Sequence, residues 1–255
     1  MNFIKKTFPV ILLFLLLGSY PLPAWNKAVK IKIGAGKAVV TLLEGNASLF
    51  KKGVTKPKAL YKGSLLAQGD RVTTGTKSRV EIKLPDKSFI RFDEKTTFVL
   101  ESVAYDQKTK KKDVNINIIL GKTWAKVPKF SGSKGRFAIT TKTSVAGVRG
   151  TDFRMNVNKD NSAVLKVYDG EVAVSKRKDT RVEKTKAKLE KPVPVAGPHP
   201  VSMEEWTYIV KSLQQINIRP DGTAAKPFRF DIAADLNDWV RWNQTRNKLL
   251  LRQGR

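Results

Sequence analysis

Short runs in which apolar and polar residues alternate are the feature that most constrains the fold of this chain. Val80, Ile82 and Leu84 are separated by charged residues, which is the pattern of a strand with one face in a hydrophobic core. The same period of two recurs in residues 29–33, 89–92, 97–103, 114–120 and 153–157, and residues 38–43 and 163–168 are further apolar runs of strand length. We therefore predict an all-β domain over residues 38–175, followed by a C-terminal extension that contains one or two helices.

Turn signals separate these runs. The Asp-Gly pair at 169–170 lies between apolar runs and predicts a hairpin. The lysine-rich stretch 105–113 is interpreted as a solvated hairpin tip. A Gly-Lys-Thr sequence at 121–123 is similar to the end of a phosphate-binding loop, but Ile116 occupies the position of the required glycine and no helix follows. We therefore interpret Gly121 as a turn between two strands.

Residues 1–24 have the organisation of a secretory signal peptide. Two lysines precede an apolar core in residues 7–18, and a proline-containing exit ends at Ala24. The apolar run is shorter than the roughly 20 residues that span a bilayer, so we expect cleavage after Ala24, and a periplasmic or secreted protein, rather than a retained anchor. Ser19 stands where a bacterial lipid-attachment site needs cysteine, which excludes a lipoprotein. Residues 25–37 are predicted to form a separate N-terminal strand segment.

Composition excludes several classes of function. The 255 residues include no cysteine and one histidine, His199, so disulfides, thiolate metal sites, a Cys nucleophile and multi-histidine sites are excluded. The carboxylates lie in no recognisable catalytic context, and we predict that the chain is not an enzyme. With 49 Lys and Arg against 22 Asp and Glu, the net charge is +27, which favours anionic polymers and membrane surfaces as partners. The signal peptide argues against nucleic acid.

The composition changes after the predicted β domain. Residues 176–201 are rich in lysine, arginine and proline, and we interpret them as a basic linker. In residues 202–255 we predict a helical extension. Ser202, with Glu205 three positions later, has the pattern of a capping box, and apolar residues follow at helical spacing. Residues 233–251 are a second, weaker helical candidate.

A glycine-rich stretch at 140–153, T-T-K-T-S-V-A-G-V-R-G-T-D-F, connects two alternating runs. Gly147 and Gly150 permit backbone angles that larger residues resist. We predict a tight crossover between strands, in which the glycines serve close backbone packing; phosphate binding would need a following helix. The polar members of the stretch, which are candidate contacts to a partner, are Lys142, Arg149 and Asp152.

The order of the motifs resembles the FecR-type domain of bacterial envelope proteins. The resemblance is carried by G-D-R-V-T-T-G at 69–75, A-G-V-R-G-T-D-F at 146–153 and V-Y-D-G-E-V-A-V at 167–174. Domains of this family are all-β, with short strands in a curved, solenoid-like or two-sheet arrangement. The signature positions, for which we expect structural roles, are Gly69, Asp70, Thr74, Gly75, Asp86, Gly121, Gly147, Gly150, Thr151, Phe153 and Gly170.

The best-known members of this family regulate sigma factors. They receive a signal from an outer-membrane receptor in the periplasm and transmit it across the inner membrane, for which they carry a cytoplasmic helical region ahead of a transmembrane helix. Only residues 1–6 precede the apolar run here, and we expect no cytoplasmic anti-sigma region. We therefore predict an exported, non-enzymatic binding or scaffold module of the cell envelope.

Two alternatives stay open. The first is the periplasmic sensor half of a split sigma-factor signalling system, and the second is an enzyme acting on envelope polysaccharide. The expected partner is another envelope protein or an anionic envelope polymer, with peripheral membrane association as a further option. No nucleic acid, cofactor or metal is expected.

Overall fold

The computed structural model describes residues 36–129, 135–177 and 207–253. All of these belong to one compact unit, Ile33–Arg255. The predicted signal peptide, nearly all of the strand segment 25–37, His199 and the Ser202 cap lie outside the described residues. Within the described part of the chain, no helix has the length and apolar character that crossing a bilayer requires.

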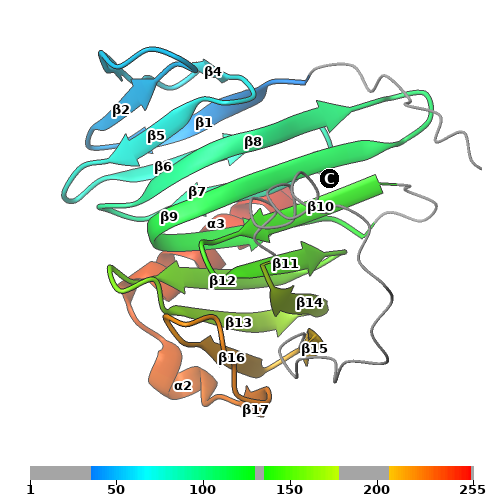
Figure 1. Ribbon diagram of the computed structural model, residues 1–255. Coiled ribbons are helices and arrows are strands. Elements are labelled where there is room, and N and C mark those ends of the chain that lie inside the picture. Colours follow the sequence, from blue (N-terminus) through cyan, green and yellow to red (C-terminus); the bar gives the residue numbers. More distant parts are fainter. Residues whose placement is uncertain (1–35, 130–134, 178–206, 254–255) are drawn as a thin grey trace, which may run out of the picture. The chain divides into compact units, whose positions relative to one another are not determined.

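Seventeen strands are joined by hydrogen bonds into an open, mixed sheet with two halves, A and B, which share the long strand β9 (Lys112–Lys126) (Figure 1). Sheet A contains β2 (Ala47–Phe50), β3 (Lys58–Ala59), β5 (Arg71–Thr74), β8 (Thr97–Tyr105), β10 (Gly135–Thr140), β11 (Ser144–Val148), β14 (Glu171–Lys176) and β15 (Thr207–Lys211). Sheet B contains β1 (Ala38–Glu44), β4 (Leu65–Leu66), β6 (Arg79–Lys83), β7 (Phe89–Phe92), β12 (Asp152–Val157), β13 (Ala163–Asp169), β16 (Gln214–Ile218) and β17 (Phe228–Arg229). The all-β prediction and its two-sheet form are confirmed.

Strand β9 passes from one sheet to the other at Gly121. Its first part pairs with β8 and, in parallel, with β10, whereas residues 121–126 pair with β12 and residues 123–126 with β7. The interpretation of Gly121 as a turn between strands is therefore wrong, because the strand continues through it. The glycine is still required: its φ is +104°, and an added Cβ would lie 2.3 Å from Thr96 Oγ1.

The apolar faces of both sheets contribute to one core. Val80 and Ile82 are fully buried, as their alternation predicts. Phe92 of sheet B stacks on Phe98 of sheet A with 3.6 Å between the ring centroids. The sheets therefore pack through the residues that the period of two identified.

The segment after the second gap is a hairpin, which corrects the prediction of a helix after Ser202. Strand β15 pairs with β14 and strand β16 pairs with β13, so the hairpin extends both sheets by one strand. Val210, Ile216 and Ile218 are buried against the core. Ile209, Val210 and Leu213 have helical spacing in the sequence but lie in this hairpin. The open edges of β13 and β14 favour strands here, because their backbone groups need hydrogen-bond partners.

The predicted basic linker, residues 176–201, lies outside the described residues except for Lys176 and Arg177. The register places Ser175 of β14 opposite Thr207 of β15. Residues 178–206 therefore connect two neighbouring antiparallel strands of one sheet. The β region does not end at residue 175, since it includes the strands up to Arg229.

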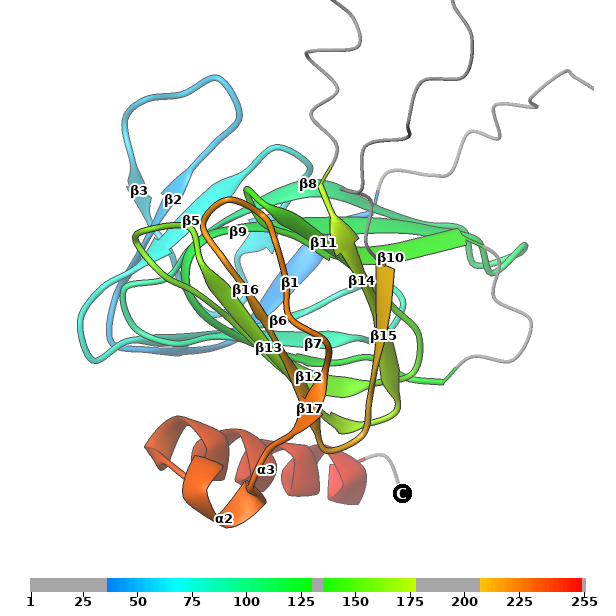
Figure 2. The same cartoon turned by 60° about the horizontal axis from the view of Figure 1, so that its bottom comes forward.

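The second helical candidate is confirmed as α2 (Ile232–Asp235) and α3 (Asp238–Gln253). Asn237 Oδ1 accepts a hydrogen bond from Val240 N at 3.1 Å, which caps the start of α3. Figure 2 shows α3 running beneath the strands of sheet B. The outer face of sheet B is thus covered by a helix that comes late in the sequence.

Candidate functional site

The predicted signature residues of the first half secure turns and strand ends. Buried Asp70 accepts from Ala67 N at 2.8 Å and pairs with Lys51 Nζ at 2.7 Å. Thr74 Oγ1 accepts from Thr96 N and donates to a backbone carbonyl. The other three positions are also structural: Gly69 has φ +88°, a Cβ on Gly75 would lie 2.0 Å from Asn46 Oδ1, and Asp86 pairs with Lys112 at 3.0 Å.

The signature residues of the second half meet at a corner where the chain leaves β11 in sheet A and enters β12 in sheet B. Gly150 has φ +64°, and a Cβ on Gly170 would lie 2.5 Å from the Gly150 carbonyl oxygen. Thr151 Oγ1 donates to Glu171 O at 2.9 Å, and Phe153 is fully buried. The predicted crossover is therefore real, and it is locked to the β13–β14 turn. Gly147 is not required in the same way, because the nearest atom to an added Cβ there, the Ala173 carbonyl oxygen, would be 3.7 Å away.

A cavity of about 670 Å³ opens at this corner. Three of its lining side chains are basic and exposed, and one is acidic. Ser212 Oγ donates to Gly170 O at 3.1 Å, which ties the β15–β16 turn to the same place. The lining residues are Lys129, Arg149, Gly150, Gly170, Glu171, Lys211 and Ser212. We call this the corner cavity; its charge suits an acidic group on a partner.

The three polar candidates of the crossover do not come together. Lys142 precedes β11 and Arg149 follows it, so the strand separates them by roughly 20 Å at about 3.3 Å per residue. Both side chains are exposed. Asp152 is the first residue of β12 in sheet B, where Lys126 Nζ lies 3.1 Å from its carboxylate and Asn247 Nδ2 donates to it at 3.0 Å. Burial raises the pKa of Asp152 even though Lys126 opposes the change.

The charged outer face of sheet B under α3 was not predicted. Glu81 and Arg91 are cross-strand partners and both are fully buried, with Arg91 Nε 2.7 Å from Glu81 Oε2. Arg246 of α3 reaches the other Glu81 oxygen at 2.7 Å. Burial disfavours the charged carboxylate, but the hydrogen bonds from Arg246 and Arg91 outweigh it and hold the Glu81 pKa below its usual value.

Arg91 connects the sheet to two further residues of the helix. Its Nη1 donates to Asn247 Oδ1 at 2.7 Å and to Asn243 Oδ1 at 3.2 Å. Nearby, Trp239 and Val240 of α3 pack on Trp124 of β9 in a small apolar cluster. The helix is therefore attached by buried polar contacts beside a limited apolar contact, rather than by an apolar stripe alone.

A second charged cluster joins α2 to sheet B. Arg154, Lys166 and Tyr168 all donate to the carboxylate of Asp235, with Lys166 Nζ at 2.9 Å. Burial acts against the charged form of Asp235, and the three donors more than compensate, so its pKa is lowered. Burial raises the pKa of Tyr168. The α2–α3 segment thus contributes the carboxylate that balances two basic residues of the sheet.

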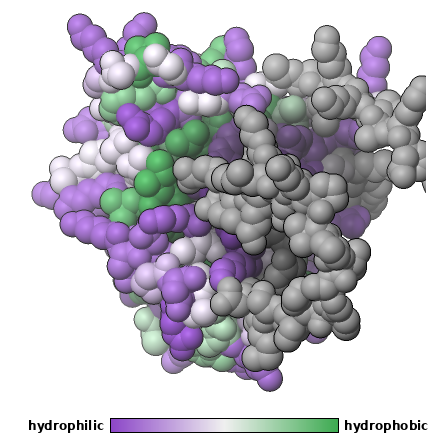
Figure 3. Space-filling view, viewed as in Figure 1, coloured by the Kyte–Doolittle hydropathy of each residue, from purple (hydrophilic) through white to green (hydrophobic). Residues whose placement is uncertain are grey.

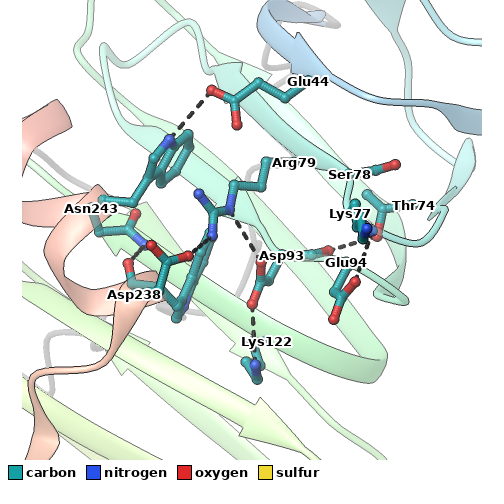
Figure 4. A network of polar contacts seen from close by, with 12 residues as sticks. Glu44, Thr74, Lys77, Ser78, Arg79, Asp93, Glu94, Lys122, Asp238 and Asn243 are labelled. Atoms are coloured by element: carbon teal, nitrogen blue, oxygen red, sulfur yellow. Dashed lines mark hydrogen bonds and ion pairs between the residues drawn. The ribbon is translucent and has the colours of Figure 1, made fainter.

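The start of α3 is fixed by the network in Figure 4. Arg79 donates to Asp238, the first residue of α3, and to Asp93 at 3.4 Å. Its guanidinium also lies 5.0 Å from the ring centroid of Trp242, close enough for a cation–π contact. Lys122 Nζ lies 3.1 Å from Asp93. Arg79, Asp93, Lys122 and Asp238 border a second cavity of about 470 Å³. Their ion pairs with one another hold the start of the helix in place.

A sequence signal for part of this network exists. Glu81 and Arg91 have opposite charges and lie at equal distances from the turn residue Asp86, so a hairpin must pair them. The partners on α2 and α3 carry no such signal. Among the described residues, no group of three or more His, Cys, Asp and Glu side chains could hold a metal ion.

Comparison with known proteins finds a family match in the central part of the chain. Residues 70–173 match the family described as FecR protein, so the predicted resemblance is confirmed. No curated protein matches the chain. Two crystal structures of a "putative anti-sigma factor" from Parabacteroides distasonis are similar, at 14% and 13% identity and a TM-score of 0.41 each. The similarity covers 63% of this chain and 60% of theirs, which is less than two thirds of their length.

Proposed function

We propose that this chain is the sensing half of a bacterial sigma-factor signalling system, and that it acts by binding another protein of the cell envelope. The match of residues 70–173 to the FecR family is the observation that carries this proposal. The proposal includes a periplasmic or secreted location and no catalytic activity. We therefore favour the sensor role, which was an alternative in the sequence analysis, over the scaffold role.

The corner cavity is the surface that we assign to the partner. Its basic residues Lys129, Arg149 and Lys211 are exposed, while Gly150 and Gly170 hold the backbone beneath them in conformations that few other residues adopt. A rigid support with exposed charges suits recognition of an acidic segment, because little order has to be gained on binding. Arg149 thus receives a binding role, and the neighbouring glycines a structural one.

The test is a reporter experiment in the source bacterium. Deletion of the gene should change the transcripts controlled by one sigma factor, and the wild-type chain should restore them. The double variant Arg149→Glu and Lys211→Glu should fail to restore them while its melting temperature stays at the wild-type value. A matched control, Lys108→Glu and Lys110→Glu at the exposed β8–β9 turn, should restore them fully. Unchanged transcripts after deletion would remove the sensor role.

A second candidate is a scaffold that binds an anionic envelope polymer. The net charge of +27 favours it. Sedimentation with purified cell-wall and lipopolysaccharide fractions separates the two functions, because a scaffold sediments with them even when deletion leaves transcription unchanged. Hydrolysis of purified cell-wall glycan, abolished by substitution of a single carboxylate, would instead establish the third hypothesis, an enzyme.

A further inference from the structure

The part of the chain that connects β2, β3 and β4 exposes large apolar side chains. Tyr61 is 67% exposed, Leu65 50% and Val54 47%. Val39, the cross-strand partner of Leu65, is exposed as well. Four of the nine exposed large hydrophobic residues in the described chain therefore belong to this end of the molecule. Such clustering indicates an interaction surface, whereas singly scattered apolar residues do not.

The stretch of chain that forms this end is basic. Residues 45–69 contain five lysines and no aspartate or glutamate. Lys51 pairs with Asp70, and the remaining four lysines are exposed; they are Lys52, Lys56, Lys58 and Lys62. We call residues 51–65, together with Val39, the lysine-rich end. Its charge and its exposed apolar groups occupy the same short stretch of chain.

The lysine-rich end is held in place by the sheets. Leu60 is buried in the core, and its N–H donates to Ala47 O at 2.9 Å. Gly63 N donates to Val40 O at 2.8 Å, which anchors the turn between Tyr61 and Leu65. Figure 1 places β2 and β4 together at one end of the molecule, and Figure 3, in the same view, shows hydrophobic atoms among hydrophilic ones there. The exposed groups are therefore preorganised.

We propose that the lysine-rich end docks on the surface of an anionic lipid bilayer. Lysines attract the phosphates of the head groups and keep their charges in water while their stems cover apolar surface. Tyr61, Leu65 and Val54 enter the interfacial region, where amphipathic aromatic and aliphatic side chains are stable. A soluble anionic polymer would use the lysines and leave the apolar residues exposed, so the combination favours a membrane. This surface is separate from the corner cavity and independent of the signalling role.

The β8–β9 turn supplies a matched control. It carries Lys108, Lys110 and Lys111, but no large hydrophobic residue between 106 and 111. Because the chain contains no cysteine, single substitutions allow labelling at one position. Thr55→Cys places an environment-sensitive NBD dye at the lysine-rich end, and Thr109→Cys places it at the control turn; both threonines are exposed.

The labelled full-length proteins are mixed with vesicles of phosphatidylcholine alone or with added phosphatidylglycerol. The dye at position 55 should brighten and shift to the blue only with the anionic vesicles, and the dye at position 109 should not respond. Each lysine near an anionic surface contributes about fivefold to binding, so Lys56→Gln, Lys58→Gln and Lys62→Gln together should weaken binding on the order of a hundredfold. Tyr61→Ser with Leu65→Ser should abolish the blue shift.

Three outcomes would overturn the proposal. The dye at position 55 could respond equally to neutral vesicles, or both dyes could respond alike to anionic ones. Dextran sulfate in solution could bind as tightly as the vesicles while Tyr61→Ser and Leu65→Ser have no effect, which would make the surface a polyanion site. If the apolar residues 7–18 inserted into the vesicles, they would tether both labelled proteins equally. Such insertion therefore cannot produce the expected difference between the dyes at positions 55 and 109. Far-UV circular dichroism and the melting temperature check that each variant is folded.

Discussion

The pair of Glu81 and Arg91 offers the sharpest test of how α3 is attached. The change Glu81→Gln keeps the size of the side chain and removes its charge. The carboxylate accepts from Arg91, from Arg246 and from Thr41 at 2.7, 2.7 and 2.8 Å. After the change Arg91 stays fully buried without its counter-ion, and the loss of one partner of a buried pair costs about 3–5 kcal/mol. Because the amide of the variant side chain still makes hydrogen bonds, we expect the lower end of this range, a loss of about 3 kcal/mol in the free energy of unfolding.

Urea unfolding at pH 7 measures this cost. With a denaturant slope of about 1–3 kcal/mol per molar urea, the midpoint should fall by at least about 1 M. Trp124 and Trp239 lie in the interface under α3, so tryptophan fluorescence reports the detachment of the helix and far-UV circular dichroism reports the sheets. Loss of the fluorescence signal before the circular dichroism signal would show that α3 detaches first.

The control is a pair of the same chemistry at the surface. Asp113→Asn removes the charge opposite Arg136, where the two side chains are 38% and 62% exposed. Exposed pairs of this kind contribute about 0–1 kcal/mol. If Glu81→Gln costs no more than Asp113→Asn, then the buried network does not hold the helix and the reasoning is wrong.

Further outcomes are expected for the glycine-rich crossover, for acidic pH and for α2. Gly150→Val should destabilise the domain by about 1–3 kcal/mol, because its φ is +64°; Gly147→Ala, where the nearest atom is 3.7 Å from the added Cβ, should be neutral or slightly stabilising, and thermal unfolding compares the two. Acidification below about pH 4.5 should lower the unfolding free energy, because folding lowers the pKa values of Glu81 and Asp235. The stability that these two carboxylates contribute is complete above their unfolded pKa values of 4.5 and 3.8. It is lost as the pH falls through their pKa values in the folded protein. Folding raises the pKa of Asp152, which acts in the opposite direction, so Asp152→Asn should steepen the loss of stability in urea titrations at stepped pH. Asp235→Asn should uncouple α2 from the sheet, seen as faster amide exchange in α2.

Much of the fold follows from local patterns. The alternation around Val80 and Ile82 predicts strands with the correct faces in the core, because a strand exposes its side chains to two sides in turn. The roles of Asp70 and Gly150 are also local, since a turn must satisfy its own backbone and only glycine adopts positive φ easily. The FecR-like order of these turns was therefore visible in the sequence and agrees with the family match.

The errors arise where a distant segment decides the outcome. The spacing of Val210 with its apolar neighbours suits a helix, but the open edges of β13 and β14 favour strands. Glycine is typical of turns, but β9 continues through Gly121 because it pairs with two strands before this residue and with two others after it. In both places tertiary hydrogen bonding overrides the local preference.

The outer face of sheet B shows the same division most clearly. Alternation assigns Glu81 to the polar side of its strand, and its pairing with Arg91 follows from the hairpin alone. By itself, therefore, the sequence determined the strands, their inward faces, the turns and the family resemblance. Only the tertiary structure decided that this charged face is buried, because α3 lies more than 150 residues away in the chain and no local pattern encodes its contact with the sheet. Burial by that helix changes Glu81 from a solvated charge into a structural anchor.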